Sequence, residues 1–235
     1  MTAPVRQARF ERPPGATEIV LVRHGESMAA VPGESFALVD GHGDPPLGPE
    51  GQEQAERVGE RLAAEGGIDA VYVTSLRRTV ETAAPFVRRR EEADDPVPVT
   101  VERDLREVHL GEWEGGLFRI KMREMGPIAT QMLAEERWDV IPGGEPAEAF
   151  RARVRAGIER IHAANPDRRV ALFTHGGVIG RIISEATGSR PFAFNGSDNG
   201  SISHLVVAGD RWIVRRYNDT AHLVGGFTSR AEALT

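Results

Sequence analysis

Two histidines whose rings could accept a phosphoryl group each follow a short apolar run of the sequence. The run Ile19–Val22 leads directly into Arg23 and His24, and the run RVALFT leads into His175 and Gly176. A neutral imidazole is nucleophilic and titrates near neutral pH, so such a ring can attack phosphorus and carry the phosphoryl group as a phosphoramidate. Titratable groups at the point where an apolar strand leaves the core therefore predict a reactive site.

Arginines near the same predicted strand ends favour an anionic substrate. Arg23 ends the first run, and Arg77 and Arg78 follow another apolar run in the stretch TSLRR. A guanidinium presents a planar fork of donors that matches phosphate oxygens and stays charged at any relevant pH. Backbone N–H groups at helix starts, expected after Thr74-Ser75 and after Gly176-Gly177, would add further donors. Such a set could offset charge on the phosphoryl oxygens during transfer.

A carboxylate in the stretch DLREVHLGEWEG is the candidate proton donor. Transfer from a phosphate ester needs an acid that protonates the leaving alkoxide and later takes a proton from water. Glu107 precedes a glycine-rich turn in this stretch. We expect that turn to hold Glu107 at the rim of the site.

Apolar runs that alternate with helical stripes predict the elements that position these groups. The predicted strands are Ile19–Val22, Ala70–Val73, Val97–Val101, Arg169–His175, Ile202–Val207 and Trp212–Val214. The predicted helices carry the apolar stripes Ala55–Leu62, Leu76–Val87, Phe150–Ile161 and Val178–Ile183. This alternation predicts an α/β three-layer sandwich, a mostly parallel sheet with helices on both faces. Ligands of such sheets lie beyond the carboxyl ends of the strands, where the histidines and arginines would meet.

The length of 235 residues suits a single domain with a substantial core. Residues 1–16 are polar and contain prolines, and we expect them to form a flexible lead-in to a domain at 17–235. Residues 113–148 mix helix formers, tryptophans and helix breakers. We interpret them as a small, partly helical insertion. The preceding stretch 28–46 is rich in Gly, Pro and Asp and is expected to be a loop.

Composition and charge exclude several classes of function. The net charge is −6 and the sequence pI is about 5.7, which does not favour nucleic acid or an acidic membrane surface as a partner. Cysteine is absent, so disulfides, thiolate chemistry and sulfur-ligated zinc are excluded. No apolar run approaches the length of a membrane span, and the first residues lack a signal-peptide core. We therefore expect a cytoplasmic protein that uses no metal and no cofactor.

Six blocks of the sequence resemble the histidine phosphatase superfamily, also called the phosphoglycerate mutase-like family. They are LVRHGES, DPPLGPEGQEQA, TSLRRTVETA, LREVHLGEWEG, PGGEPAEAFRARV and FTHGGVIGRI, in the family's order over about residues 17–225. RHG alone is a weak signal, but its combination with a downstream HGG and the intervening blocks is specific. The resemblance implies a mostly parallel sheet between helices, with a small helical insertion.

The resemblance also implies a role for each matching residue. His24 matches the phosphorylated histidine, and Arg23 matches the first arginine that binds the phosphate. Arg78 matches the second arginine, and His175 matches the second active-site histidine. Glu107 matches the proton donor of those members that have one at this position.

Two positions depart from the family pattern, and one segment separates two branches of the family. Ala30 stands where many members place an asparagine that supports the phosphate pocket, and Gly48 stands where Ser or Thr is usual. Either change could loosen the pocket. Phosphoglycerate mutases usually carry an NERHYG-type segment around the acid, whereas REVHLGEWEG resembles the phosphatase branch.

The remaining charged and titratable candidates have plainer interpretations. We expect Arg77 to form a surface ion pair. The other histidines are expected in a solvated loop (His42), in surface packing or a rim contact (His109), on an exposed helix face (His162) and in structural roles (His204 and His222). For His222 a role in supporting the site also stays open. For Glu145 and Arg153 an ion pair that anchors the insertion and a contact with the leaving group both stay open.

The sequence as a whole predicts a metal-independent phosphatase of small phosphorylated metabolites that acts through a phosphohistidine at His24. Arg23, Arg78, His175 and Gly176 would bind the phosphoryl group, and Glu107 would act as acid and then base. A phosphoglycerate mutase is the first alternative, because a mutase differs mainly in excluding water from the phosphohistidine. A non-catalytic phosphate-binding module is the second. Dimers are common in the family, so a homodimer is an option that the sequence leaves open.

Overall fold

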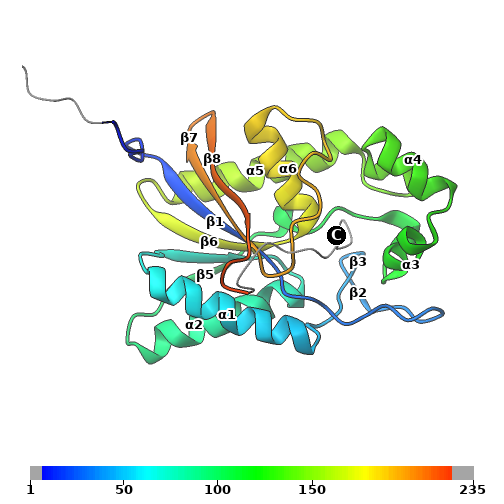
Figure 1. The fold of residues 1–235 in the computed structure, drawn as a ribbon, viewed down its shortest axis with the longest axis horizontal. Coiled ribbons are helices and arrows are strands. Elements are labelled where there is room, and N and C mark those ends of the chain that lie inside the picture. Colours follow the sequence, from blue (N-terminus) through cyan, green and yellow to red (C-terminus); the bar gives the residue numbers. More distant parts are fainter. Residues whose placement is uncertain (1–6, 224–235) are drawn as a thin grey trace, which may run out of the picture.

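A central six-stranded sheet orders its strands β5-β4-β6-β1-β7-β8 (Figure 1). The computed structural model describes residues 7–223. The strands are β1 (Thr17–Arg23), β4 (Ala70–Val73), β5 (Val99–Val101), β6 (Arg169–Thr174), β7 (Ile202–Ala208) and β8 (Arg211–Asp219). Strands β1, β4, β5 and β6 pair in parallel, whereas β7 is antiparallel to β1 and to β8. The predicted mostly parallel sheet is confirmed.

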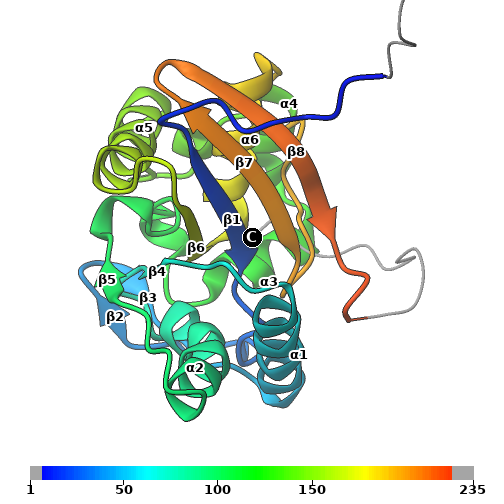
Figure 2. The same ribbon diagram turned by 90° about the vertical axis from the view of Figure 1, so that its left-hand side faces the viewer.

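Helices cover both faces of this sheet, which explains why its central strands are apolar on both sides. The long helices are α1 (Pro49–Glu65), α2 (Arg77–Glu92), α5 (Ala147–Ala164) and α6 (Gly176–Thr187). Figure 2 shows α1 and α2 on one side of the sheet and α5 and α6 on the other. Side chains of β1 alternate between the two layers, so Ile19 and Leu21 pack with α5 and α6, and Val20 and Val22 pack with α1 and α2. The predicted three-layer sandwich is confirmed.

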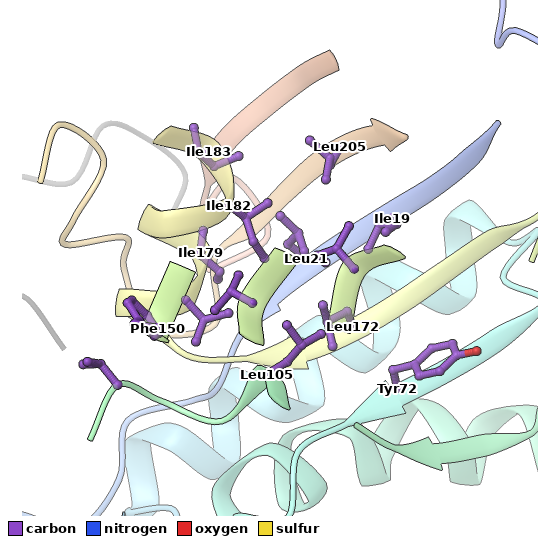
Figure 3. Packing of buried hydrophobic residues seen from close by; sticks show 14 of the residues in the cluster. Ile19, Leu21, Tyr72, Leu105, Phe150, Leu172, Ile179, Ile182, Ile183 and Leu205 are labelled. Atoms are coloured by element: carbon purple, nitrogen blue, oxygen red, sulfur yellow. The ribbon is translucent and has the colours of Figure 1, made fainter. Parts of the chain in front are cut away.

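The larger of the two apolar clusters lies beneath α5 and α6. Figure 3 shows Ile19, Leu21 and Leu172 of the sheet facing Ile179, Ile182 and other aliphatic side chains of this layer. Most of these side chains are fully buried. Because burying one such side chain stabilises a fold by about 1.5–3 kcal/mol, this cluster fixes β1 and β6 firmly beneath the site.

Element boundaries differ from prediction mainly at the sheet edges. β5 is only Val99–Val101, because Pro98 has no N–H to donate to a strand ladder. β8 extends past the predicted Val214 to Asp219. The sequence analysis missed this extension because the added residues are mostly polar and partly exposed, and so show no apolar pattern. Helix α2 continues through Pro85 without a break.

The segment at 113–148 and the stretch at 28–46 lie beyond the carboxyl ends of the parallel strands (Figure 1). The first contains two short helices, α3 (Leu117–Glu124) and α4 (Pro127–Glu135), and a 3₁₀ turn, η3 (Trp138–Val140). Aromatic rings hold it together, since Phe118 lies 6.2 Å from Trp113 and 5.9 Å from Trp138 between ring centroids. The stretch expected to be a plain loop contains the hairpin β2–β3 (Leu38–Val39 and His42–Gly43).

The two ends of the predicted domain are described only in part. Residues 7–16 contain no helix or strand, and the N–H of Gly15 donates to Asp167 at 2.6 Å. The flexibility expected for 1–16 and the extension of the domain to 235 stay predictions, because residues 1–6 and 224–235 lie outside the described residues. Within 7–223, no helix combines the length and the apolar character that crossing a membrane requires.

Two glycines allow α1 to approach the loop that follows β1 at van der Waals distance. A Cβ on Gly51 would lie 1.9 Å from the carbonyl oxygen of Glu26, and a Cβ on Gly25 would lie 2.4 Å from the carbonyl oxygen of Gly51. Both distances are far shorter than any real Cβ contact. The backbone that follows His24 is therefore set by contact with the first turn of α1.

We predict that Gly51→Ala will lower the free energy of unfolding by about 1–3 kcal/mol, the usual cost of overpacking a close contact. The substitution should also displace the loop that carries His24. Gly48→Ala is the matched control, because a Cβ at Gly48 would meet nothing closer than 3.7 Å. Urea unfolding of the two variants measures the difference, and equal stability for both would contradict the close contact.

Candidate active site

The parallel pairing of β1 with β6 brings the two candidate histidines together. Arg23 and Thr174 are register partners at the ends of these strands, so His24 and His175 leave the sheet side by side. Their ring centroids lie 5.2 Å apart in an edge-to-face arrangement. His24 is 4 % exposed and His175 is fully buried.

A backbone carbonyl fixes the tautomer of His24. Its Nδ1 lies 2.7 Å from the carbonyl oxygen of Gly25, and a carbonyl only accepts, so Nδ1 carries the proton. Nε2 then keeps its lone pair. Burial, and after it the positive charges of Arg78 and Arg23, holds the pKa of His24 well below 6.5. The ring is therefore neutral and nucleophilic at neutral pH.

His175 is the N-cap residue of α6 and has a similar environment. Its Nε2 lies 3.1 Å from the hydroxyl of Thr74, at the end of β4. Burial, followed by the charges of Arg78 and His24, lowers its pKa well below 6.5. A neutral imidazole here can donate to or accept from a phosphoryl oxygen, according to its tautomer.

Two of the predicted arginines are buried beside the histidines, and the third is not. Arg23 is buried and donates to the carbonyl oxygen of Ser197. Arg78 lies in the first turn of α2 and donates to the carbonyl oxygen of Gly43 at 2.9 Å. Burial lowers the pKa of Arg78 to about 10, so it stays charged at neutral pH. Arg77 is exposed and pairs with Glu81 at 2.9 Å, which matches the surface ion pair expected for it.

Glu107 is 5 % exposed and lies in the wall of the site rather than at its rim. Its Oε1 accepts from the N–H of Val108 at 2.9 Å, and its Oε2 accepts from the N–H of Gly177 at 3.2 Å. Burial is the largest influence on Glu107 and raises the pKa of its carboxyl group. A carboxylic acid with a raised pKa is suited to donate a proton.

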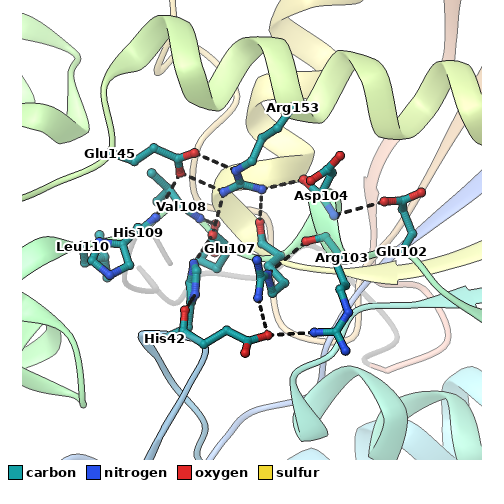
Figure 4. Close-up of polar contacts among 12 residues, drawn as sticks. His42, Glu102, Arg103, Asp104, Glu107, Val108, His109, Leu110, Glu145 and Arg153 are labelled. Atoms are coloured by element: carbon teal, nitrogen blue, oxygen red, sulfur yellow. Dashed lines mark hydrogen bonds and ion pairs between the residues drawn. The ribbon is translucent and has the colours of Figure 1, made fainter.

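An ion pair between Arg153 and Glu145 holds the segment that carries Glu107. The guanidinium of Arg153 on α5 donates to both carboxylate oxygens of Glu145, at 2.7 and 2.8 Å (Figure 4). It also donates to the carbonyl oxygens of Asp104, Arg106 and Glu107, at 2.5, 2.7 and 2.8 Å. The structure thus favours an anchoring role for Glu145 and Arg153, which together hold the segment that carries Glu107.

His42 is buried in the site, and the expectation of a solvated loop position is wrong. Its Nε2 lies 3.1 Å from the carbonyl oxygen of Glu107, and its ring meets His109 at 5.2 Å between centroids. The hairpin β2–β3 folds over the site and carries His42 inward. Burial is the main cause that lowers its pKa.

The other three histidines have structural contacts. His162 is half-buried rather than exposed, with Nδ1 2.9 Å from the hydroxyl of Thr17. His204 lies 3.2 Å from a carboxylate oxygen of Glu18. His222 lies 3.0 Å from the carbonyl oxygen of Gly200.

A cavity opens over His24. Its polar lining includes His24, Arg78, Glu107 and Arg119, and its apolar lining includes Phe36, Leu110, Trp113 and Phe118. The sequence analysis did not select Arg119, which reaches the cavity from α3. Neutral histidines, several guanidinium groups and a buried acid around one cavity can bind a phosphate ester and transfer its phosphoryl group.

The family model of the histidine phosphatase superfamily (branch 1) matches residues 19–220. The chain belongs to this superfamily. It is 34 % identical to phosphoglycerate mutase-like protein 4 of Arabidopsis thaliana over 211 residues, 88 % of this chain and 86 % of the relative. It is 31 % identical to the metal-independent phosphoserine phosphatase of the same plant over 220 residues, 91 % of this chain and 87 % of the relative.

Solved structures of the superfamily have the same fold. The mycobacterial glucosyl-3-phosphoglycerate phosphatase superposes with a TM-score of 0.70 at 26 % identity, covering 87 % of this chain and 100 % of the other. Phosphoglycerate mutase of Bacillus anthracis superposes with a TM-score of 0.73 at 22 % identity, covering 89 % of this chain and 96 % of the other. The second likeness shows the fold alone.

The two departures from the superfamily pattern have different surroundings. Gly48 is the N-cap residue of α1 and is not among the residues that line the cavity, so its effect falls on the helix start. Ala30 lies near the start of α3, where a Cβ on Gly116 would be 3.2 Å from the Ala30 Cβ. Ala30 also does not line the cavity, but it lies against α3, which carries the lining residue Arg119.

We predict that Arg78→Gln will raise the pKa of both His24 and His175 toward 6.5, because the charge of Arg78 is the second-largest cause of each lowered value. Burial remains, so both pKa values should stay below 6.5. Nuclear magnetic resonance titration of the histidine ring nitrogens measures the shift. Arg77→Gln is the control, because it removes the same charge from the exposed neighbouring residue and should leave the pKa of both histidines unchanged. Unchanged pKa values in Arg78→Gln would contradict the electrostatic coupling.

Proposed function

We propose that this superfamily member hydrolyses small-molecule phosphomonoesters through a phosphohistidine at His24, without a metal ion or cofactor. The observation that carries the proposal is the state of His24. Its proton is held on Nδ1 by Gly25, its pKa is lowered by burial and by Arg78, and it lines the cavity together with Glu107. A nucleophile, a positive surround and an acid are thus present in one place.

The first half of the reaction uses the lone pair on Nε2 of His24. That pair forms a bond to phosphorus while the bond from phosphorus to the ester oxygen breaks. Glu107 gives its proton to the leaving oxygen, which the raised pKa of its carboxyl group favours. The phosphorylated ring carries a positive charge, and the carbonyl oxygen of Gly25 continues to accept its Nδ1–H.

The second half returns the site to its starting state. Water attacks phosphorus, the phosphorus–nitrogen bond breaks, and the electron pair returns to Nε2 of His24. Glu107, now a carboxylate, takes the proton of the attacking water and is again an acid for the next turnover. Arg23, Arg78 and His175 hold the phosphoryl oxygens in both halves, where charge develops.

The substrate class follows from the lining of the cavity. Phe36, Leu110, Trp113 and Phe118 offer apolar contacts to the leaving group, and Glu114 and Arg119 offer polar ones. Two similar proteins are named for phosphoserine and for glucosyl-3-phosphoglycerate, which are small and polar. We propose metabolites of that kind as substrates, and the cytoplasm as the compartment, because charged phosphate esters do not cross membranes unaided. Nucleic acid and membranes are not among the proposed partners, and a homodimer stays a prediction.

A phosphoglycerate mutase is the second candidate, because one similar protein is named as mutase-like. A mutase would return the phosphoryl group to a glycerate rather than to water. The two activities differ in one product, since only the phosphatase releases inorganic phosphate in proportion to turnover. A phosphate-binding module would do neither.

We predict phosphate release from p-nitrophenyl phosphate, sugar phosphates and phosphoserine in the presence of a chelator, with no release by His24→Ala. Rapidly quenched wild-type protein should hold a phosphoryl group that is stable to alkali and labile to acid, as a phosphoramidate is. His162→Ala is the matched control, because His162 lies outside the cavity. Turnover that survives in His24→Ala would exclude His24 as the nucleophile, and exchange between 2- and 3-phosphoglycerate without phosphate release would favour the mutase.

We predict that Glu107→Gln will slow hydrolysis of alkyl phosphates by about 10²- to 10⁴-fold, the usual contribution of general acid–base catalysis. The loss should be smaller for phosphorylation of the enzyme by p-nitrophenyl phosphate, because p-nitrophenolate leaves without a proton. The variant should lose some stability, because a glutamine oxygen can accept from only one of the two N–H groups, of Val108 and Gly177, that the carboxylate accepts from. Burst kinetics and thermal unfolding measure both effects, and equal losses for the two leaving groups would contradict the role of Glu107 as the acid.

A further inference from the structure

The insertion places a guanidinium against the loop that carries the nucleophile. Arg119 lies in the first turn of α3. Its Nη1 donates to the carbonyl oxygen of Met28 at 2.8 Å, and its Nη2 donates to the hydroxyl of Ser27 at 2.6 Å. These residues follow His24 closely in the sequence. The side chain is thus attached to the same loop as His24, although it comes from a distant part of the chain.

Arg119 belongs to the electrostatic environment of the reacting groups. It lines the cavity with His24, Arg78 and Glu107. Its charge is one of those that lower the pKa of His24, and its own pKa is lowered by burial and by repulsion from Arg23. Arg78 and Arg119 both line the cavity, and two guanidinium groups around one cavity favour a multiply charged anion between them.

The remaining donors of Arg119 are available to such an anion. Its hydrogen bonds within residues 7–223 go to one hydroxyl and one carbonyl, and it forms no ion pair with a carboxylate in that range. A guanidinium has five N–H groups, so about three remain after these two bonds. These two bonds orient the fork and go to uncharged groups, while the nearby carboxylate of Glu26 raises the pKa of Arg119.

The position of Arg119 is linked to the departure at residue 30. A Cβ on Gly116, the N-cap residue of α3, would lie 3.2 Å from the Cβ of Ala30 and 3.0 Å from the ring of Phe36. The small residues at both positions let the start of α3 approach the loop. Ala30 offers no side-chain donor here, where the resemblance to the superfamily implies an asparagine in many members.

We propose that Arg119 is a third arginine of the phosphoryl site and supplies the donor that position 30 lacks. This inference rests on the proposed function, because it concerns the group that His24 accepts. A guanidinium brings charge as well as a fork of donors, and a hydrogen bond to an anion is roughly twice as strong from a charged donor as from a neutral one. The insertion then takes part in the chemistry and not only in selecting the leaving group.

Inorganic phosphate is the direct probe, because it contains the phosphoryl oxygens and no leaving group. Isothermal titration should give a dissociation constant about 10- to 100-fold weaker for Arg119→Gln than for wild type, the loss expected for one charged hydrogen-bonding partner. Arg119→Lys, which keeps the charge but not the fork, should fall between them. Arg123→Gln is the control, because Arg123 is an exposed arginine one turn further along α3. Phosphate affinity in Arg119→Gln equal to that of wild type would overturn the inference.

Two substrates distinguish a phosphoryl contact from a contact with the leaving group. Arg119→Gln should lower kcat/KM equally for p-nitrophenyl phosphate and for phosphoserine, which carries a carboxylate on its leaving group. A loss confined to phosphoserine would overturn the proposal and assign Arg119 to the leaving group. If wild type hydrolyses neither ester, the proposed function fails, whereas the phosphate titration still tests Arg119 separately.

A second substitution separates the donor role from a structural one. Ala30→Asn in the Arg119→Gln background restores the donor that is usual at this position. We expect this double variant to recover phosphate affinity by about tenfold over Arg119→Gln, as one regained hydrogen bond to an anion would give. Absence of any recovery, with thermal unfolding unchanged between the two variants, would overturn the link between Arg119 and position 30.

Discussion

The in-register parallel pairing of β1 with β6 is the interaction on which the site depends. Arg23 is paired with Thr174, and each of these two residues is followed by a histidine. The pairing therefore brings the two rings together, with their centroids 5.2 Å apart. A shift of one residue would turn every side chain of β1 to the opposite face of the sheet. Side chains of β1 are closely packed in both helix layers, so such a shift would require both layers to repack. The core therefore sets the geometry of the reacting groups.

Backbone carbonyl groups then hold the cations in place and keep their charge available. Arg78 donates to Gly43 and Arg119 to Met28, and a carbonyl orients a guanidinium without cancelling its charge as a carboxylate would. Arg153 shows the contrasting arrangement, because it is paired with Glu145 and has a purely local role in holding the Glu107 segment. Burying cations costs stability; the carboxylates of Glu107 and Asp44 offset part of that cost at Arg78, and a bound phosphate would offset more. The neutral state of both histidines adds no further positive charge to the site.

The sequence predicts the parts of the site that local pattern determines. His24 and His175 could be placed because buried strands leave continuous apolar runs, and a residue after such a run lies at a known edge of the sheet. Arg78 could be separated from Arg77 only by resemblance to the family. The hairpin that buries His42 has two strands of two residues each, too short for any period to appear. Arg119 lies on a helix whose position depends on contacts among Trp113, Phe118 and Trp138, which no local pattern reveals.

The same contacts explain why the insertion and the chemistry cannot vary independently. Glu114 accepts from the N–H of Gly43 at 2.7 Å and from that of Leu110 at 2.9 Å, so it joins the hairpin over the site to the segment that follows Glu107. Phe118 packs into the aromatic cluster, while its neighbour Arg119 reaches the loop after His24. A change that reshapes the cavity for a different leaving group would therefore also move a cation beside the nucleophile. Selection for a new substrate must preserve the approach of α3 to that loop, or replace the donor that Arg119 provides.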